Sequence, residues 1–390
     1  MRSPNIIILF LATTLWASAQ AESDPYAEAI SAIKAVQNEG AGNEEASVAW
    51  KLLVQNDASM VVTLLESMSN TSGLASNWLI SAAQTIVDRE LANKSDLPLA
   101  SIGDFLMDTR QAPRARRWAF EVVQRVDPDT ASKLVPGMLN DPSTELRRDA
   151  VAGLLAQADA LAGAENTQGA SIVYRQALGA ARDVDQIDTA SKALSELGES
   201  VDLSEHFGFL THWSVIGPFH NDGRSGFDEV FPPETEIDLT AEYDGKAGKV
   251  KWSSFETADP YGMVDVNKAY GPLKEVTAFA YTEYTSANDQ PVELRLGCKN
   301  GWKIWLNGEL VFGRDEYHRG MSIDQYKLPI SLKKGKNTLL VKLCQNEQEE
   351  DWTVQWQFQL RVCDATGTAV LASDRRPTPT EKRKSKLQNS

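Results

Sequence analysis

Cysteine and histidine are scarce in this chain, with three cysteines and four histidines among 390 residues. None of them stands at the spacing of a paired metal-ligand motif, and no serine or cysteine lies in a nucleophile turn. The sequence therefore predicts no catalytic residue, no metal ion and no cofactor. One catalytic alternative stays open, an acid–base pair between His318 and a nearby carboxylate, Asp315 or Asp324.

Positive charge is also in short supply, because 39 lysines and arginines face 54 aspartates and glutamates and leave a formal net charge of −15. An acidic surface of this kind repels a phosphate backbone, which argues against nucleic acid as a partner. Basic residues gather only at the end of the chain, where residues 374–390 hold six lysines and arginines. This tail is polar and contains two prolines, so we expect it to be disordered.

Long hydrophobic runs are missing beyond the first residues, and no later segment reaches the roughly 20 residues that a membrane-spanning helix needs. The chain opens with Arg2, an apolar stretch over residues 6–15 and a small-residue end at Ala19 and Ala21. This order is typical of a secretory signal peptide, which we place at residues 1–21. An uncleaved membrane anchor is the weaker alternative, so we expect a protein exported to the periplasm, the envelope or the extracellular space.

Residues 25–200 show an internal repeat when the sequence is shifted against itself by 40 residues. Trp78 then falls on Trp118, and apolar residues recur three and four positions apart, as on a helix with one buried stripe. Asp127-Pro128 and Asp141-Pro142 mark helix starts, because aspartate caps a helix and proline suits its first turn. Both tryptophans are expected to pack between helices, and the repeat predicts an α-solenoid.

One copy of this repeat, residues 139–151, resembles a HEAT repeat. In that family an aspartate at the turn and an arginine six residues later, here Asp141 and Arg147, form polar ladders between neighbouring repeats. The resemblance implies a HEAT-like helical repeat domain over residues 25–200. Solenoids bind through an extended face, so this half is expected to dock a protein partner.

The second half, residues 205–372, changes to a period of two and is rich in aromatic residues. Asn307-Gly308 stands between two apolar runs and predicts a hairpin with a type I′ turn over residues 302–312. Short strands at regular spacing without helices between them are typical of an antiparallel β-sandwich. The other expected strands are Thr211–Ile216, Val250–Phe255, Thr277–Thr285, Pro291–Cys298, Gln325–Ile330, Asn337–Cys344 and Thr353–Cys363.

The segments 213–219, 305–308 and 332–342 resemble the galactose-binding-like jelly roll, a module of lectin-like domains that also stands beside glycosidases. Some of those relatives bind calcium and sugar with paired aspartates before the hairpin, where this chain has Lys299-Asn300. The resemblance implies a jelly-roll β-sandwich and leaves the ligand open, because a fold does not fix a function. The predicted fold is thus multidomain, an N-terminal α-solenoid followed by an antiparallel jelly roll.

The alternation within the strands also places the three cysteines. Cys298 falls on an apolar face and is predicted to lie in the core, whereas Cys344 and Cys363 fall on the opposite faces of their strands and are predicted to point outward. We expect all three to be free thiols.

A binding site is expected on the hairpin and the loop after it. If Lys303 pairs with Phe312 and Trp305 with Leu310, then Trp305 and Phe312 share the outer face of the sheet as a half-exposed platform for a sugar ring. The full set of predicted ligand-binding residues is Trp305, Phe312, Arg314, Asp315, Tyr317, His318 and Asp324.

The sequence favours a non-catalytic binding protein, with a sandwich that recognises a glycan or another envelope component and a helical half that docks a protein. Two alternatives remain open. One is a purely structural protein–protein scaffold of the envelope, and the other is an accessory or degenerate carbohydrate-active enzyme.

Overall fold

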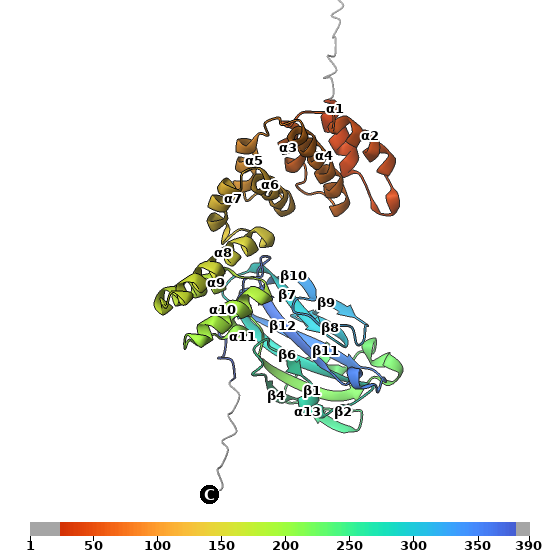
Figure 1. Ribbon diagram of the computed structural model, residues 1–390. Helices are drawn as coiled ribbons and strands as arrows, with labels where there is room; N and C mark the ends of the chain where they lie inside the picture. Colours follow the sequence, from red (N-terminus) through yellow and green to blue (C-terminus); the bar gives the residue numbers. More distant parts are fainter. Residues whose placement is uncertain (1–23, 380–390) are drawn as a thin grey trace, which may run out of the picture. The chain divides into compact units, whose positions relative to one another are not determined.

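The computed structural model describes residues 24–379, and its contacts divide the chain into two units at Pro136 and Gly137. The predicted signal peptide lies outside the described residues. The division does not fall at the linker expected around residues 200–205, because the helices before this linker share an apolar core with Phe207 and Phe209 after it. Among the described residues, the first unit contains helices alone, and the second contains helices and all the strands (Figure 1).

The first unit is helical. Its helices are α1 (Pro25–Lys34), α2 (Asn43–Leu53), α3 (Met60–Glu66), α4 (Gly73–Ala92), α5 (Leu99–Met107), α6 (Pro113–Val126) and α7 (Pro128–Leu134), with a short 3₁₀ turn at Asn38–Gly40. Asp127 caps α7 as predicted and accepts a hydrogen bond from the Thr130 amide at 3.0 Å. A cap of this kind satisfies one of the amides that a helix start leaves unpaired.

Side chains join α4 and α6 in register. Trp118 is buried and donates to Gln84 Oε1 at 3.1 Å, whereas Trp78 is only partly buried. Arg125 pairs with Asp88 at 2.7 Å, 37 positions earlier in the chain. These contacts place α6 beside α4.

The second unit begins with α8 (Thr144–Gly163), α9 (Thr167–Ala180), α10 (Val184–Glu196) and α11 (Leu203–Phe207). Helix α8 starts two residues later than the Asp141-Pro142 signal predicted, because Ser143 is its cap. Asp141 instead accepts a hydrogen bond from the Ser143 amide at 2.8 Å, and Arg147 Nε donates to the Asp141 carbonyl at 2.9 Å.

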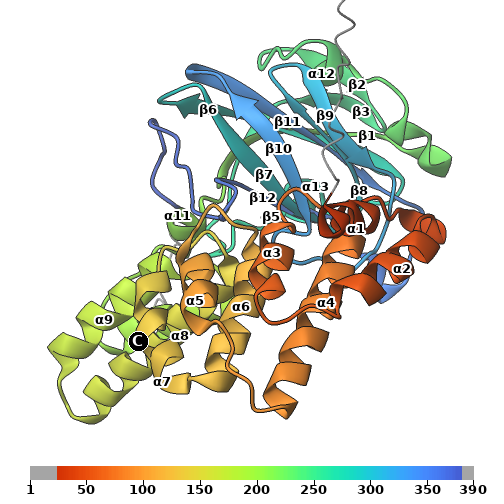
Figure 2. The same cartoon turned by 90° about the horizontal axis from the view of Figure 1, so that it is seen from above.

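Helices α8–α11 share one apolar core with the first residues of the β region, since Phe207 and Phe209 belong to it and Tyr261 packs against it. Arg182 donates to Thr368 Oγ1 at 2.8 Å and ties the α9–α10 connection to the end of the chain. Figures 1 and 2 agree that α11 lies beside β12 (Gln357–Cys363). The helices and the sheets therefore form one unit.

Two antiparallel sheets follow. The six-stranded sheet has the order β4 (Ser253–Glu256), β1 (His212–His220), β6 (Val276–Ser286), β11 (Gly335–Gln345), β8 (Gly301–Leu306), β9 (Glu309–Arg314). The four-stranded sheet has the order β10 (Tyr326–Leu332), β7 (Gln290–Cys298), β12, β5 (Val264–Asp265). A separate hairpin pairs β2 (Glu242–Gly245) with β3 (Gly248–Lys251), and short helices stand at α12 (Pro232–Thr235) and α13 (Asn267–Tyr270).

The inner faces of both sheets contribute to a single core. Trp213 from the six-stranded sheet meets Phe358 from the four-stranded sheet edge to face, with ring centroids 5.1 Å apart. The predicted alternation is confirmed on β7, where Val292, Leu294 and Leu296 all lie in this core. The Asn307-Gly308 turn is confirmed too, since both residues have positive φ between the paired strands β8 and β9.

The outer face of the six-stranded sheet is apolar as well, and residues 221–252 cover it. Phe231 and Trp252 from this segment pack with Phe219, Phe279 and Trp305 from the sheet. In Figure 2 the β2–β3 hairpin and α12 lie together on the side of the sheets away from α8–α11.

Lys342 holds this covering segment down from the middle of β11. Its ammonium is fully buried and donates to the carbonyls of Phe227 and Glu229 at 3.1 and 2.6 Å and to the Glu234 carboxylate at 2.8 Å. Three acceptors match the three N–H donors of an ammonium, so the buried charge is both paired and hydrogen-bonded.

All three cysteines are free thiols, as predicted, but all three are buried. The outward direction expected for Cys344 and Cys363 does not expose them, because other segments cover those faces. Burial raises the pKa of Cys298 and Cys344 to about 12 and that of Cys363 to about 11.

The first residues of the expected disordered tail, predicted over 374–390, are ordered. Asp374 accepts a hydrogen bond from Thr285 Oγ1 at 2.6 Å, and Arg375 donates to the Phe209 carbonyl at 2.9 Å. The prediction of disorder was wrong here because these side chains find partners on the sandwich.

The position of the unit boundary can be tested with two fragments. Residues 137–379 should unfold in one cooperative transition, whereas residues 205–379 lose α8–α10 and leave Phe207, Phe209 and Tyr261 exposed to water. We expect the shorter fragment to aggregate or to melt at a clearly lower temperature in calorimetry. Equal melting temperatures would show that the helices are dispensable and that the boundary lies near residue 200.

The hairpin turn can be tested at Gly308, which has a φ of 83° and open space around its Cα. Gly308→Val meets no atom but forces a β-branched residue into positive φ, so it should lower the free energy of unfolding by about 1–3 kcal/mol. Denaturant unfolding measures this loss. Gly308→Asn, which tolerates the left-handed region, should lose much less.

Candidate functional site

Trp305 does not form an exposed platform. It lies on the outer face of the sheet, as predicted, but only 7% of it is exposed, because residues 221–252 cover it. The expectation of a half-exposed indole was therefore wrong. The side chain is part of the second apolar core.

Phe312 faces away from Trp305. A β-bulge shifts the hairpin register between Ile304 and Trp305, so that Phe312 pairs with Ile304 rather than with Lys303. One extra residue in a strand reverses the faces of all residues beyond it. Phe312 instead meets Trp302, with ring centroids 6.0 Å apart, and is 40% exposed at the sheet edge.

The predicted site residues in the loop after the hairpin do not form one cluster. Arg314 and Asp315 are exposed, whereas Tyr317 and His318 are partly buried. His318 Nε2 lies 2.6 Å from Asn346 Oδ1, and its ring meets Trp352 at right angles with centroids 5.5 Å apart. Trp352 is 61% exposed, so an accessible indole does stand near the predicted loop.

Asp324 belongs to a different cluster. Its carboxylate accepts hydrogen bonds from Arg361 at 2.7 and 2.6 Å and from Arg295 at 2.7 Å. These two guanidinium groups lower the pKa of Asp324 against the effect of its burial. With Asp324 engaged by two arginines and His318 Nε2 facing an amide oxygen, the acid–base pair considered between them is not formed.

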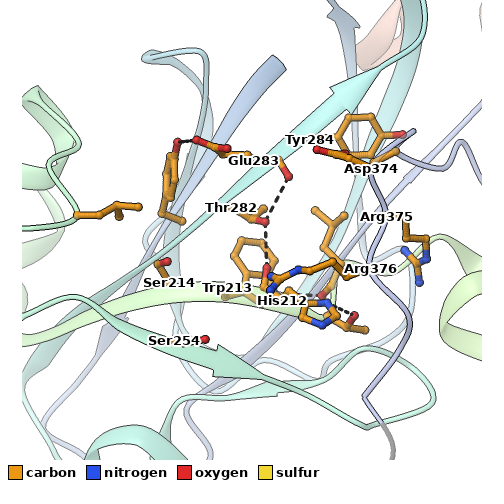
Figure 3. A pocket seen from close by; sticks show the side chains of 15 residues that line it. His212, Trp213, Ser214, Ser254, Thr282, Glu283, Tyr284, Asp374, Arg375 and Arg376 are labelled. Atoms are coloured by element: carbon orange, nitrogen blue, oxygen red, sulfur yellow. Dashed lines mark hydrogen bonds between the residues drawn. The ribbon is translucent and has the colours of Figure 1, made fainter. Parts of the chain in front are cut away.

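A polar cleft of about 410 Å³ lies where β1 and β6 separate, past the last paired residues Ser214 and Tyr281 (Figure 3). The sequence did not indicate it. Its walls come from β1, β4, β6, the covering segment and the chain end: Leu210, Thr211, His212, Trp213, Ser214, Leu239, Ser254, Tyr281, Thr282, Glu283, Tyr284, Ala372, Asp374, Arg375 and Arg376.

Hydrogen bonds fix several of these groups. Thr282 Oγ1 donates to the His212 carbonyl at 2.9 Å and bridges the separated strands, as Figure 3 shows. Tyr281 donates to Glu283 at 3.1 Å. Burial is the main cause that lowers the pKa of His212, with Arg376 acting in the same direction and Glu256 against it.

Two arginines from the chain end complete the cleft. Arg375 donates one hydrogen bond to the Phe209 carbonyl, while its Nε and Nη2 are buried and have no hydrogen-bond partner among the described residues. Arg376 is largely exposed and lies 3.9 Å from Glu256. The accessible guanidinium donors at this end of the cleft therefore belong to Arg376, because the unpaired nitrogens of Arg375 are out of reach.

No family model matches the chain, and no curated protein matches it. A β-glucosidase from Kluyveromyces marxianus in complex with glucose aligns at 20% identity over 23% of this chain and 10% of its own, with a TM-score of 0.18. An anti-sigma factor domain-containing protein aligns at 11% identity over 42% and 48%, with a TM-score of 0.24.

A Pseudomonas fluorescens alkylpurine DNA glycosylase, AlkC, bound to DNA containing an abasic site analog, aligns at 12% identity over 88% of this chain and 94% of its own, with a TM-score of 0.20. The chain spans less than half the length of the β-glucosidase and of the anti-sigma factor domain-containing protein. TM-scores this low define neither the fold nor the function of this chain.

Two further observations concern the described residues 24–379 alone. No helix among them is long and apolar enough to span a bilayer. Within the same range, no group of three or more histidine, cysteine, aspartate or glutamate side chains is placed to hold a metal ion.

The burial of Trp305 can be tested by truncation. Trp305→Ala should lower the free energy of unfolding by about 3–5 kcal/mol, because it empties an aromatic position in the outer core. Denaturant unfolding of the full chain measures the loss. Trp352→Ala serves as the control, because the loss of its exposed indole should lower the stability little. If neither variant changes the free energy of unfolding, the packing of Trp305 is contradicted.

Proposed function

We propose that this chain is an exported, non-catalytic binding protein whose β-sandwich binds a glycan in the cleft between β1 and β6. The cleft itself is the observation that carries the proposal. Its volume of about 410 Å³ suits one or two sugar rings, and it opens on a rigid scaffold of paired strands.

The lining matches the chemistry of a polyol. Hydroxyl groups come from Ser214, Ser254 and Thr282, and each both donates and accepts. Glu283 adds an acceptor, while Tyr281 and Leu239 add apolar surface. A sugar presents alternating hydroxyls and C–H faces, so mixed walls of this kind satisfy both.

Arg376 gives the cleft its accessible cationic donor, because its side chain is 62% exposed at the rim. A planar guanidinium group can bind two oxygens at once, which suits adjacent hydroxyls or a carboxylate on a sugar. Arg375 also lines the cleft, but its Nε and Nη2 are buried, so it shapes the wall and presents no free donor.

The finer fold assignment belongs to the same proposal. The hairpin at Asn307-Gly308 and two antiparallel sheets on one core support a galactose-binding-like jelly roll. The pairing of α4 with α6, and the Arg147 to Asp141 contact at a repeat turn, support HEAT-like repeats. Export rests on the signal-like sequence of residues 1–21.

Docking of a protein by the helical unit is the second part of the proposal, and it would also serve a purely structural scaffold. Val48 and Leu52 on α2 are 66% and 38% exposed and line a groove beside α1. Glu28, Glu44 and Glu45 surround the same groove. Charge complementarity favours a basic amphipathic helix as its occupant.

A glycan array with the full chain, followed by titration of the best ligand, tests the cleft. Ser254→Trp places an indole in the cleft from the exposed strand β4 and should weaken binding at least tenfold. Ser331→Trp is the matched control, because Ser331 is exposed on β10, in the other sheet, and should leave the affinity unchanged.

Trp352→Ala separates this cleft from the loop that the sequence favoured. Full binding by Trp352→Ala together with loss in Ser254→Trp supports the cleft. Loss in Trp352→Ala alone would move the site to the His318 loop, and no glycan bound by the wild type would refute the proposed function.

A further inference from the structure

A second cavity, separate from the cleft, lies inside the second unit where α9–α11 meet the end of the chain. Its volume is about 130 Å³. It shares none of its lining residues with the cleft, and these are Gly179, Ala181, Arg182, Ile187, His206, Phe207, Gly367, Thr368 and Ala369.

Arg182 dominates the polar wall of this cavity. Its two terminal nitrogens donate to the carbonyls of Gly179 and Ala181 and to Thr368 Oγ1, at 2.6 to 3.0 Å. Its Nε is buried and has no partner among residues 24–379. The guanidinium is thus held rigidly. Nη2 uses one of its two N–H groups for Thr368 and keeps the other for a ligand, whereas the buried Nε is out of a ligand's reach.

Among residues 24–379, no carboxylate forms an ion pair with Arg182. Asp324, in the buried network near the chain end, is engaged by Arg295 and Arg361. The Asp364 carboxylate accepts hydrogen bonds within its own turn, from the amide and hydroxyl of Thr366 and from the amide of Thr368. The charge of the Arg182 guanidinium is therefore not neutralised by a carboxylate in direct contact with it.

Further cations surround the cavity. Burial is the first cause that lowers the pKa of Arg182 to about 10, and the charges of Arg147 and Arg361 act in the same direction, while Asp364 opposes them. His206 lines the cavity, and burial with the charges of Arg182 and Arg361 lowers its pKa to about 4. The local field disfavours any additional cation and favours an anion.

The remaining walls are apolar. Ile187 and Phe207 are almost fully buried, and Ala181 and Ala369 add methyl groups. A hydrated inorganic ion gains nothing from such walls, whereas a short hydrocarbon chain does. The small volume excludes long chains.

We propose that this cavity binds a short aliphatic carboxylate of two to four carbons, with its carboxylate on Arg182 and its chain against Ile187 and Phe207. One carboxylate oxygen accepts the second N–H of Arg182 Nη2, which Thr368 does not use. The bound molecule joins α9–α11 to the turn at residues 367–369, so it also stabilises the unit.

Titration of the full chain with propionate, followed by NMR of the histidine ring protons, tests this site. The chain has four histidines, and the His206 signal is assigned by its loss in His206→Gln. We expect propionate to shift the His206 signal in a saturable manner, while the signals of the other three histidines stay in place. No saturable shift at His206 would overturn the proposal.

Two variants locate the anion. Arg182→Gln should weaken binding at least tenfold, with Arg175→Gln as its control, because Arg175 is exposed on α9, just before the connection that holds Arg182, and pairs with Glu199. Since Arg182→Gln also removes a contact to Thr368, a second variant leaves the guanidinium intact. Gly179→Leu has open space around its Cα and should block the cavity, with Gly153→Leu on α8 as its control.

Inorganic phosphate and octanoate complete the test. Saturation by phosphate at lower concentration than propionate would assign the site to an inorganic oxyanion and overturn the carboxylate. Binding of octanoate as tight as that of propionate would show that the cavity does not limit the length of the hydrocarbon chain, which would overturn the proposed limit of four carbons. Binding unaffected by both Arg182→Gln and Gly179→Leu would place propionate elsewhere and likewise overturn the proposal.

Discussion

The second unit depends on a buried ion network centred on Arg361. This guanidinium donates to both oxygens of Asp324 and to the carbonyls of Phe207 and Gly367. One side chain of β12 thereby holds the loop after the hairpin, the end of α11 and the turn near the chain end. Removing one member of such a network leaves a buried charge uncompensated, which costs about 3–5 kcal/mol. The cleft and the smaller cavity both use segments that this network positions.

Local patterns predicted the elements of the fold well, because they depend on neighbours in the chain. The Asn307-Gly308 turn and the alternation on β7 are examples, and Asp127 caps its helix as expected. Exposure was harder to predict. Trp305 and Cys344 lie on the faces that parity assigned, yet other segments bury them. Whether a face is covered depends on residues far away in the sequence, such as 221–252.

The candidate sites show the same limit. Phe312 changed faces because of one bulge, which has no clear signal in the sequence. Asp324 was predicted to share a binding site with His318, but its carboxylate pairs with the buried arginines instead. The cleft was missed because Arg375 and Arg376 read as part of a solvated tail, and because its hydroxyl groups come from strands distant in the chain. Only three-dimensional pairing brings them together.

The three buried thiols carry a consequence for how such a chain reaches its folded state. In an oxidising compartment free cysteines are exposed to mispairing, and thiolates are the species that react. Burial with a raised pKa makes Cys298, Cys344 and Cys363 unreactive once the sheets have closed. For the exported protein that we propose, the hazard is therefore confined to the interval before the sheets close over the three thiols.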